Sequence, residues 1–216
     1  MKLLLLGATG RCGNLVLFKA LKDGHEVTVI ARDPSKLEET TATVIKGSPY
    51  DKDTVEKAIA GCDAVICTLN VSRVSDNPWA KLRAPHDLIS KSVNNAVKAM
   101  HKHNIKRIIS LSVLGVGDSK KGIPFLARLF VYKSNIKYAM WDHERQENIM
   151  AQSETDWTAV RLPMLNDTKG EAKVLVNMGD DTKLSKSINR ESVARFVLDI
   201  LDHPNYYKKI VAISNA

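Results

Sequence analysis

The chain has 216 residues, of which 44% are hydrophobic and 26% are charged, and this composition excludes a wholly disordered or low-complexity protein. The length suits one large domain. No apolar run approaches the roughly 20 residues that a membrane span needs. The apolar run that starts at Met1 is interrupted by Gly7, which makes it too short for the core of an export signal, so we expect no export.

The net charge of +8 arises from 32 Lys and Arg against 24 Asp and Glu, and the basic residues are scattered. The sequence shows no zinc-ligand array, no aromatic RNA-binding motif and no strongly basic helix. We therefore expect no metal, no nucleic acid and no membrane as a partner, whereas a phosphorylated small molecule would account for part of the charge. Cys12, Cys62 and Cys67 form no CxxC motif, which predicts free thiols and a cytoplasmic protein.

Short apolar stretches alternate with amphipathic ones from the first residue onward. We predict strands at residues 2–6, 26–31, 42–46, 63–69, 107–112, 157–161 and 210–213. We predict helices over residues 15–21, 53–60, 85–103 and 142–152, and a last helix that Asn189 caps. This alternation predicts an α/β fold of the Rossmann type, with a doubly wound, mainly parallel sheet and helices on both faces. No linker divides the chain, so we expect residues 1–216 to form a single domain.

Three irregular segments directly follow predicted strands, at residues 70–84, 114–141 and 165–188. In an open α/β sheet, ligands bind at the carboxyl ends of the strands. We therefore expect all three segments on the substrate side of the sheet.

A glycine-rich turn of the form GxxGxxG lies between the first predicted strand and the first predicted helix. Gly7 permits a tight turn, Gly10 lets the backbone approach a pyrophosphate, and Gly13 lets helix and strand pack closely. The helix N-terminus offers N–H groups and partial positive charge to the anion. We expect cofactor contacts from Gly7, Thr9, Gly10, Arg11, Cys12 and Gly13.

The end of the second strand distinguishes NADP from NAD. An acidic residue there would hold the ribose 2′-hydroxyl of NAD, but this chain has Arg32, whose guanidinium suits a 2′-phosphate. Arg11 and Lys36 add charge nearby, and Asp33 could tie down the turn. The sequence thus favours NADP(H) over NAD(H). By position in the fold, we also expect Ser48 at the adenine, and Leu69 and Asn70 beside the ribose and pyrophosphate.

Seven motifs point to a family. They are GATGxxG at 7–13, EVTVxxRDxSxL at 26–37, GxDAVI at 61–66, SLS at 110–112, DHxRxE at 142–147, WTAVRLPML at 157–165 and INRESVARFVLDIL at 188–201. Through them the sequence resembles the atypical short-chain dehydrogenase/reductase proteins with one NAD(P)-binding domain. This group includes biliverdin-IXβ reductase, which is also a flavin reductase, and the NmrA-like proteins.

The resemblance implies an NADPH-dependent reductase whose acceptors are isoalloxazines or other flat aromatic molecules. It also implies that the nicotinamide lies near Ser112 and near Pro163 and Met164. Ser48 departs from the family pattern, which has an acidic residue on the adenosine side at that position.

The residues disfavour ordinary ketone or alcohol chemistry. The wider superfamily protonates a carbonyl with the tyrosine of Tyr-x-x-x-Lys, but the residues four positions after Tyr132 and Tyr138 are Ile136 and Asp142. The other tyrosines lack the lysine too. A carbonyl needs a positioned acid because its alkoxide is very basic. A flavin or quinone delocalises the incoming electron pair, so stacking against the nicotinamide supplies most of the catalysis.

Two side chains are catalytic candidates. The Ser112 hydroxyl could bind the nicotinamide amide or the acceptor, or it could cap the strand end. His143 could donate a proton near neutral pH, or it could be a structural residue beside Asp142. The aromatic stretch at 125–141 could line the acceptor pocket, close over it as a lid, or pack as a helix.

Three functions remain open. The first is a reductase that transfers hydride from NADPH to a flavin, quinone or similar flat acceptor. The second is a non-enzymatic NADP(H) sensor that acts through a protein partner. The third is an isomerase or carbonyl reductase with an unrecognised acid such as His143.

Overall fold

The computed structural model describes residues 1–37, 39–75 and 77–216. Its strands are β1 (Lys2–Leu6), β2 (Glu26–Ala31), β3 (Thr43–Lys46), β4 (Ala64–Cys67), β5 (Arg107–Val113), β6 (Asp156–Leu162), β7 (Met164–Asn166), β8 (Val174–Asn177), β9 (Ser187–Asn189) and β10 (Lys209–Asn215). Its α-helices are α1 (Arg11–Lys22), α2 (Lys52–Ile59), α3 (Leu88–Lys102), α4 (Phe125–Lys133), α5 (Ile136–Ala151) and α6 (Arg190–Asp199). Three short 3₁₀ helices are η1 (Pro34–Lys36), η2 (Gly117–Gly122) and η3 (Pro204–Tyr206).

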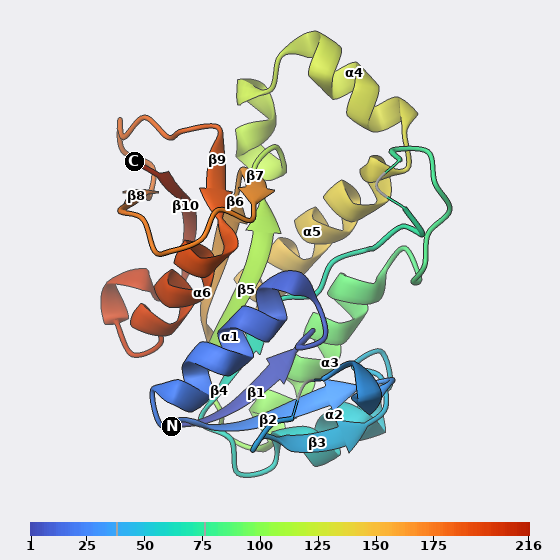
Figure 1. Cartoon of the computed structure of the whole chain (residues 1–216), viewed down its shortest axis with the longest axis vertical. Helices are drawn as coiled ribbons and strands as arrows, with labels where there is room; N and C mark the ends of the chain where they lie inside the picture. The colour runs from blue at the N-terminus through green and yellow to red at the C-terminus, as the bar shows by residue number, and fades with distance from the viewer. Residues whose placement is uncertain (38, 76) are drawn as a thin grey trace.

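One large sheet organises the molecule (Figure 1). Its strand order is β3-β2-β1-β4-β5-β6-β10-β8, and a separate small sheet pairs β7 with β9. Every neighbouring pair in the large sheet is parallel except β10 and β8. The strand order reverses between β1 and β4, which places a topological switch point beside the glycine-rich turn. The predicted doubly wound, mainly parallel sheet is confirmed.

Two hydrophobic cores lie on the two faces of this sheet, and β1 contributes to both. Leu3 and Leu5 join the core beneath α1 and α6, whereas Leu4 and Leu6 join the core beneath α2, α3 and α5. Because successive side chains of a strand point to opposite faces, a strand buried on both sides must be apolar at every position. This requirement explains the unbroken leucine run.

Two of the irregular segments contain regular structure that the sequence pattern did not predict. Helix α4 lies inside the segment 114–141, and α5 begins at Ile136 rather than at Asp142. The segment 165–188 contains β8 and parts of β7 and β9. Helix α4 buries none of its residues, so its apolar spacing does not follow the core-facing pattern on which the prediction relied.

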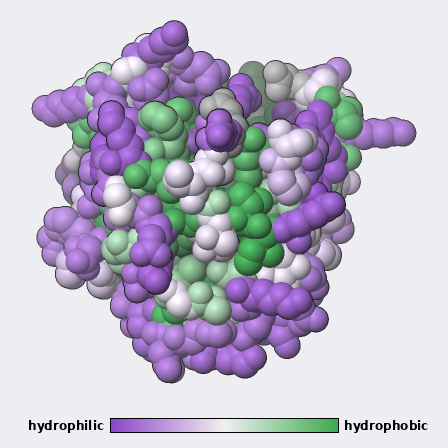
Figure 2. All heavy atoms as spheres, turned by 60° about the horizontal axis from the view of Figure 1, so that its bottom comes forward, coloured by the Kyte–Doolittle hydropathy of each residue, from purple (hydrophilic) through white to green (hydrophobic). Residues whose placement is uncertain are grey.

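The surface at the lower end of Figure 1 is not uniformly polar. Figure 2 shows apolar side chains gathered there inside a ring of polar ones. Large apolar side chains such as Phe18 and Val44 stay exposed, which is common on folded proteins.

Among the described residues, none of the helices is long and apolar enough to cross a membrane.

Candidate cofactor site and the surroundings of Ser112

The glycine-rich turn brings α1 unusually close to β1. Gly7 has a φ of +94°, which L side chains rarely adopt, and a Cβ there would lie 2.8 Å from Thr68 Oγ1. A Cβ on Gly13 would lie 2.1 Å from the Gly7 carbonyl oxygen, so a side chain would push the helix off the strand. Gly10 differs, because the nearest atom to a Cβ there is the Gly7 oxygen at 3.3 Å. Gly10 is exposed, and this contact is looser than the one at Gly13.

The N-terminus of α1 presents free backbone donors. The N-cap Gly10 has no side chain to cap the helix, and the first turn holds no acidic residue. The Asn14 N–H donates to the Gly10 carbonyl at 2.8 Å, and in the described part of the chain the three N–H groups of residues 11–13 have no acceptor. Such a helix end binds anions.

Two arginines lie beside this helix end. Arg11, which is exposed, has its Nη1 at 3.6 Å from the carboxylate of Asp167. The same carboxylate accepts a hydrogen bond from buried Arg190, the first residue of α6. Sequence reasoning missed Arg190, although it follows directly after the correctly predicted cap Asn189. Burial raises the pKa of the Cys12 thiol, which stays protonated near neutral pH and is no nucleophile there.

In the turn after β2, the adjacent side chains of Arg32 and Asp33 have different surroundings. Asp33 Oδ1 accepts from the Ser35 N–H at 3.3 Å and from the Ser35 hydroxyl at 2.7 Å, and these bonds hold the pKa of its carboxyl below the usual value. Lys36 lies 3.7 Å from the other carboxylate oxygen. Asp33 therefore ties down the turn. Arg32 is exposed and makes no ion pair with any described residue.

The remaining adenosine-side candidates lie where their strands end. Ser48 follows β3, and its hydroxyl accepts from the Tyr50 N–H at 3.2 Å. Leu69 is half-buried and Asn70 is exposed, just after β4. Thr68, which sequence reasoning missed, donates its hydroxyl to the Leu6 carbonyl at 3.0 Å and so holds the end of β4 against the glycine turn.

The Ser112 hydroxyl is engaged inside the protein. It donates to Glu147 Oε1 at 2.6 Å, and Arg161 donates to both oxygens of Glu147 at 3.0 and 2.8 Å. Arg161 also bonds Asp118 of η2 at 2.5 Å. Ser112, Glu147 and Arg161 are buried. Ser112 can therefore accept a hydrogen bond from a ligand, but its own proton is already committed to Glu147.

His143 lies in the core rather than in an open cleft. It is 3% exposed, and its Nδ1 accepts from Gln146 Nε2 at 2.8 Å. Burial lowers the pKa of the imidazole to about 4, so the ring is neutral at pH 7. Of the two alternatives for His143, this arrangement favours the structural residue over the proton donor.

The neighbouring Asp142 has a structural partner as well. Its carboxylate accepts from the Ile89 N–H at 2.7 Å and from the Ser90 N–H at 3.2 Å, which caps the N-terminus of α3 from a different helix. Tyr138 is half-buried, with its ring 5.8 Å from that of Trp141. No cation stands at the position where the superfamily pattern places its lysine.

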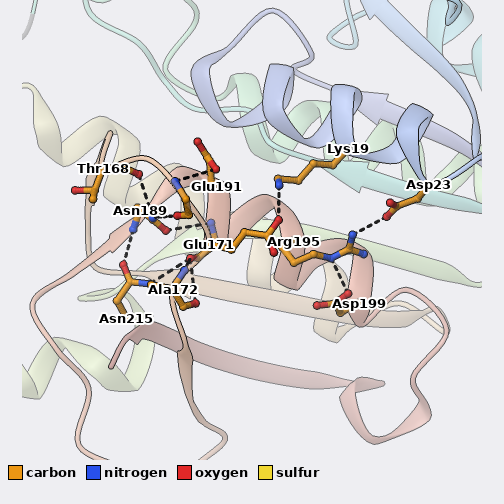
Figure 3. A network of polar contacts seen from close by, with 12 residues as sticks. Lys19, Asp23, Thr168, Glu171, Ala172, Asn189, Glu191, Arg195, Asp199 and Asn215 are labelled. Carbon is orange, nitrogen blue, oxygen red and sulfur yellow. Dashed lines mark hydrogen bonds and ion pairs between the residues drawn. The ribbon is translucent and has the colours of Figure 1, made fainter.

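Hydrogen bonds and an ion pair hold the segment after β6 against α1 and α6 (Figure 3). Pro163 is half-buried and Met164 is exposed at the start of β7. Asn189 Nδ2 donates to the carbonyls of Thr168 and Gly170 at 3.0 and 2.5 Å. Glu171 pairs with Lys19 of α1, the Ala172 N–H donates to Ser192, and the Gly170 N–H donates to Glu191. The first part of the segment 165–188 is therefore held along α1, from Arg11, which pairs with Asp167, to Lys19 in its last turn.

The three substrate-side segments meet in pairs. Asn135 Nδ2 donates to the carbonyls of Trp79 and Ala80, which joins segment 114–141 to segment 70–84. A hollow of about 570 Å³ lies over β6 and β10, between residues 114–119 and residues 177–184. Arg161 is one of its lining residues, so the Glu147 network separates this hollow from Ser112. Within the described ranges, no group of three or more metal-ligating side chains gathers.

A profile of the NAD(P)H-binding family matches residues 7–204. The chain belongs to this family. The match begins at Gly7 and extends through α6, so it covers both the glycine turn and the Glu147–Arg161 network. This NAD(P)H-binding protein thus has a fold of the kind found in oxidoreductases.

Known proteins resemble it along most of its length. The photosystem II assembly factor Ycf39 of Synechocystis is 23% identical over 97% of this chain, but the chain spans only 61% of that relative. A short-chain dehydrogenase/reductase from Veillonella parvula, solved with NADP, superposes with a TM-score of 0.78 and 18% identity, covering 99% of this chain and 94% of that one. ChuY, an anaerobillin reductase from Escherichia coli, superposes with a TM-score of 0.78 and 20% identity, covering 100% of this chain and 97% of that one. At these identities the two structures show the shared fold.

Proposed function

We propose that this protein is an NADPH-dependent reductase of a flat conjugated acceptor, of the flavin or quinone class. The observation that carries the proposal is the glycine turn, where free N–H groups at the start of α1 lie on the same sheet edge as the unpaired Arg32. When bound, the cofactor supplies the hydride. The N–H groups of residues 11–13 would hold its pyrophosphate, with Arg11 beside them.

The preference for NADPH rests on the turn after β2. Asp33 would have to reach a ribose hydroxyl to favour NADH, but Ser35 and Lys36 already engage its carboxylate. Arg32 is left to form charge-assisted hydrogen bonds with a 2′-phosphate. The NADP complex of the structurally similar Veillonella protein supports this choice.

The two candidate acids guide the choice of acceptor class. Neither suits the protonation of a ketone, because the Ser112 hydroxyl donates to Glu147 and His143 is neutral and buried. A ketone would need such a donor, whereas a flavin or quinone can take its proton from solvent. ChuY, which has the same fold, is an anaerobillin reductase, and a reductase on this fold agrees with the proposal.

An acceptor panel tests the proposal. The purified protein is mixed with NADPH and with FMN, riboflavin, a soluble quinone or a simple ketone, and the absorbance of the reduced nicotinamide is followed. We expect acceptor-dependent oxidation with a flavin or quinone and none with the ketone. No oxidation with any flavin or quinone, or oxidation with the ketone alone, would contradict the proposal.

A non-enzymatic NADP(H) sensor is the second candidate. The Ser112 hydroxyl donates its proton to Glu147, which disfavours ketone chemistry. The same bond is compatible with a sensor, because a sensor needs no proton donor. A sensor would bind NADPH tightly, give no turnover with any acceptor, and retain a protein partner with only one redox form of the cofactor.

A further inference from the structure

Helix α4 carries its apolar side chains on the outside. Phe125 and Leu126 are 66% and 76% exposed, and Leu129 and Phe130 are 41% and 45% exposed. Positions spaced by one, four and five residues share one side of a helix, so these four form a continuous stripe. The opposite side of the helix, with Val131, faces Met140 of α5 around a small void.

A tryptophan from another segment extends this stripe. Trp79 is 57% exposed, and its ring meets the ring of Phe130 edge-on with 5.4 Å between centroids. Its indole N–H donates to the Lys133 carbonyl at 3.2 Å. We call Trp79, Phe125, Leu126, Leu129 and Phe130 the α4 stripe. Because two segments build it through a hydrogen bond and a ring contact, it is a constructed surface rather than scattered apolar residues.

The chain segment that contains α4 carries charges of one sign. Residues 119–141 contain five Lys and Arg and no Asp or Glu. Lys121, Arg128 and Lys133 of this segment are exposed. An apolar stripe with exposed cations beside it is complementary to a surface that is apolar inside and anionic outside.

The stripe also lies far from the cofactor turn. In Figure 1, α4 forms the upper end of the molecule, beyond the end of β5, and packs on α5. An object that docks on this end would leave the β1–α1 turn open.

From these observations we propose that the α4 stripe docks the protein on the surface of an anionic lipid bilayer. The Phe and Leu side chains enter the boundary between headgroups and acyl chains, where Trp79 also suits the interface. The neighbouring lysines and arginine contact lipid phosphates. The sequence argument against a membrane partner concerned spans and strongly basic helices, whereas here an exposed cation next to the apolar stripe also comes from η2, outside α4.

Vesicle sedimentation tests the proposal on the full chain. Vesicles of phosphatidylcholine alone are compared with vesicles that also contain phosphatidylglycerol. We expect the protein to sediment with the anionic vesicles and to be released from them by salt. With neutral vesicles the protein should stay in solution. The double variant Leu126→Ser, Phe130→Ser should bind about tenfold more weakly. Phe18→Ser, which removes an equally exposed side chain from α1, should bind like the unaltered protein.

Folding is controlled by measuring the NADPH affinity of each variant without vesicles, which should not change. The proposal is overturned if the unaltered protein ignores anionic vesicles or if the α4 double variant binds them equally well. It is also overturned if the double variant instead abolishes self-association in sedimentation velocity, which would make the stripe an interface between copies. A change confined to the KM for the acceptor would make the stripe a lid and overturn it too.

Discussion

Gly13 and Gly10 lie three residues apart in one turn but carry different constraints. Gly13→Ala would place a Cβ 2.1 Å from a backbone oxygen, so we expect it to lower the free energy of unfolding by roughly 1–3 kcal/mol. At Gly10 a Cβ would lie 3.3 Å from the Gly7 oxygen, a tight contact that a small shift relieves, so Gly10→Ala should destabilise the fold much less than Gly13→Ala but lose NADPH affinity, because its methyl occupies the approach of the pyrophosphate. Urea unfolding and calorimetric titration measure the two effects. A Gly10→Ala protein that binds NADPH normally would contradict this account of the turn.

His143 makes stability depend on pH. Its pKa is about 4 in the folded protein, against about 6.5 when unfolded, so the unfolded state binds the proton more readily. The stabilisation is complete above pH 6.5 and is lost as the pH falls toward 4, by about 3 kcal/mol in all. His143→Gln keeps an acceptor for Gln146 but does not titrate. We expect its unfolding free energy to fall less than that of the unaltered protein between pH 7 and pH 5. Parallel urea curves that fall equally in both proteins would refute this.

Residue types predicted some local contacts but not those made across the fold. Asn189 as a helix cap and Asp33 as a turn residue follow from bonds to residues two or three positions away. Ser112 was singled out, but its partner Glu147 comes from α5, which is distant in the sequence. The motifs DHxRxE and WTAVR contained Glu147 and Arg161, yet nothing in the spacing indicated that these two side chains meet.

Helix α3 depends on a cap that its own segment does not supply. The helix begins at Leu88, and its local N-cap Asp87 makes no capping bond, whereas Asp142 of α5 accepts from two of its N–H groups. Asp142→Ala should therefore lower the free energy of unfolding by about 1–2 kcal/mol, and Asp87→Ala by much less. Chemical denaturation of the two variants compares these costs. An equal cost for both would show that Asp142 is not the cap.

Strands were easier to predict than the elements on the substrate side. The central strands are buried on both faces, so nearly every residue in them is apolar and the pattern is unmistakable. Helix α4 turns its apolar side outward, and β8 becomes a strand only by pairing with β10 about 40 residues away. Local pattern carries no information about either arrangement, which is why the acceptor side of the site could not be drawn from the sequence.

In the proposed function, cofactor and acceptor bind at different parts of one sheet. The glycine turn, Arg32 and Asn70 lie where β1, β2 and β4 end, while the three substrate-side segments extend from β4, β5 and β6. The family match and the sequence motifs describe the first part well. In the proposed function the choice of acceptor depends on the second part, where segments that are distant in sequence meet.

Calorimetric titration of the protein with NADPH and NADH, repeated on Arg32→Ala, tests the cofactor assignment most directly. We expect tighter binding of NADPH, and a loss of about 1.5–3 kcal/mol for NADPH alone in the variant, which is roughly a 10- to 150-fold increase in Kd. Lys22→Ala, which removes an exposed charge at the far end of α1, should change neither affinity. Equal affinities for the two dinucleotides, or an Arg32→Ala variant that binds NADPH as well as the unaltered protein, would contradict the assignment.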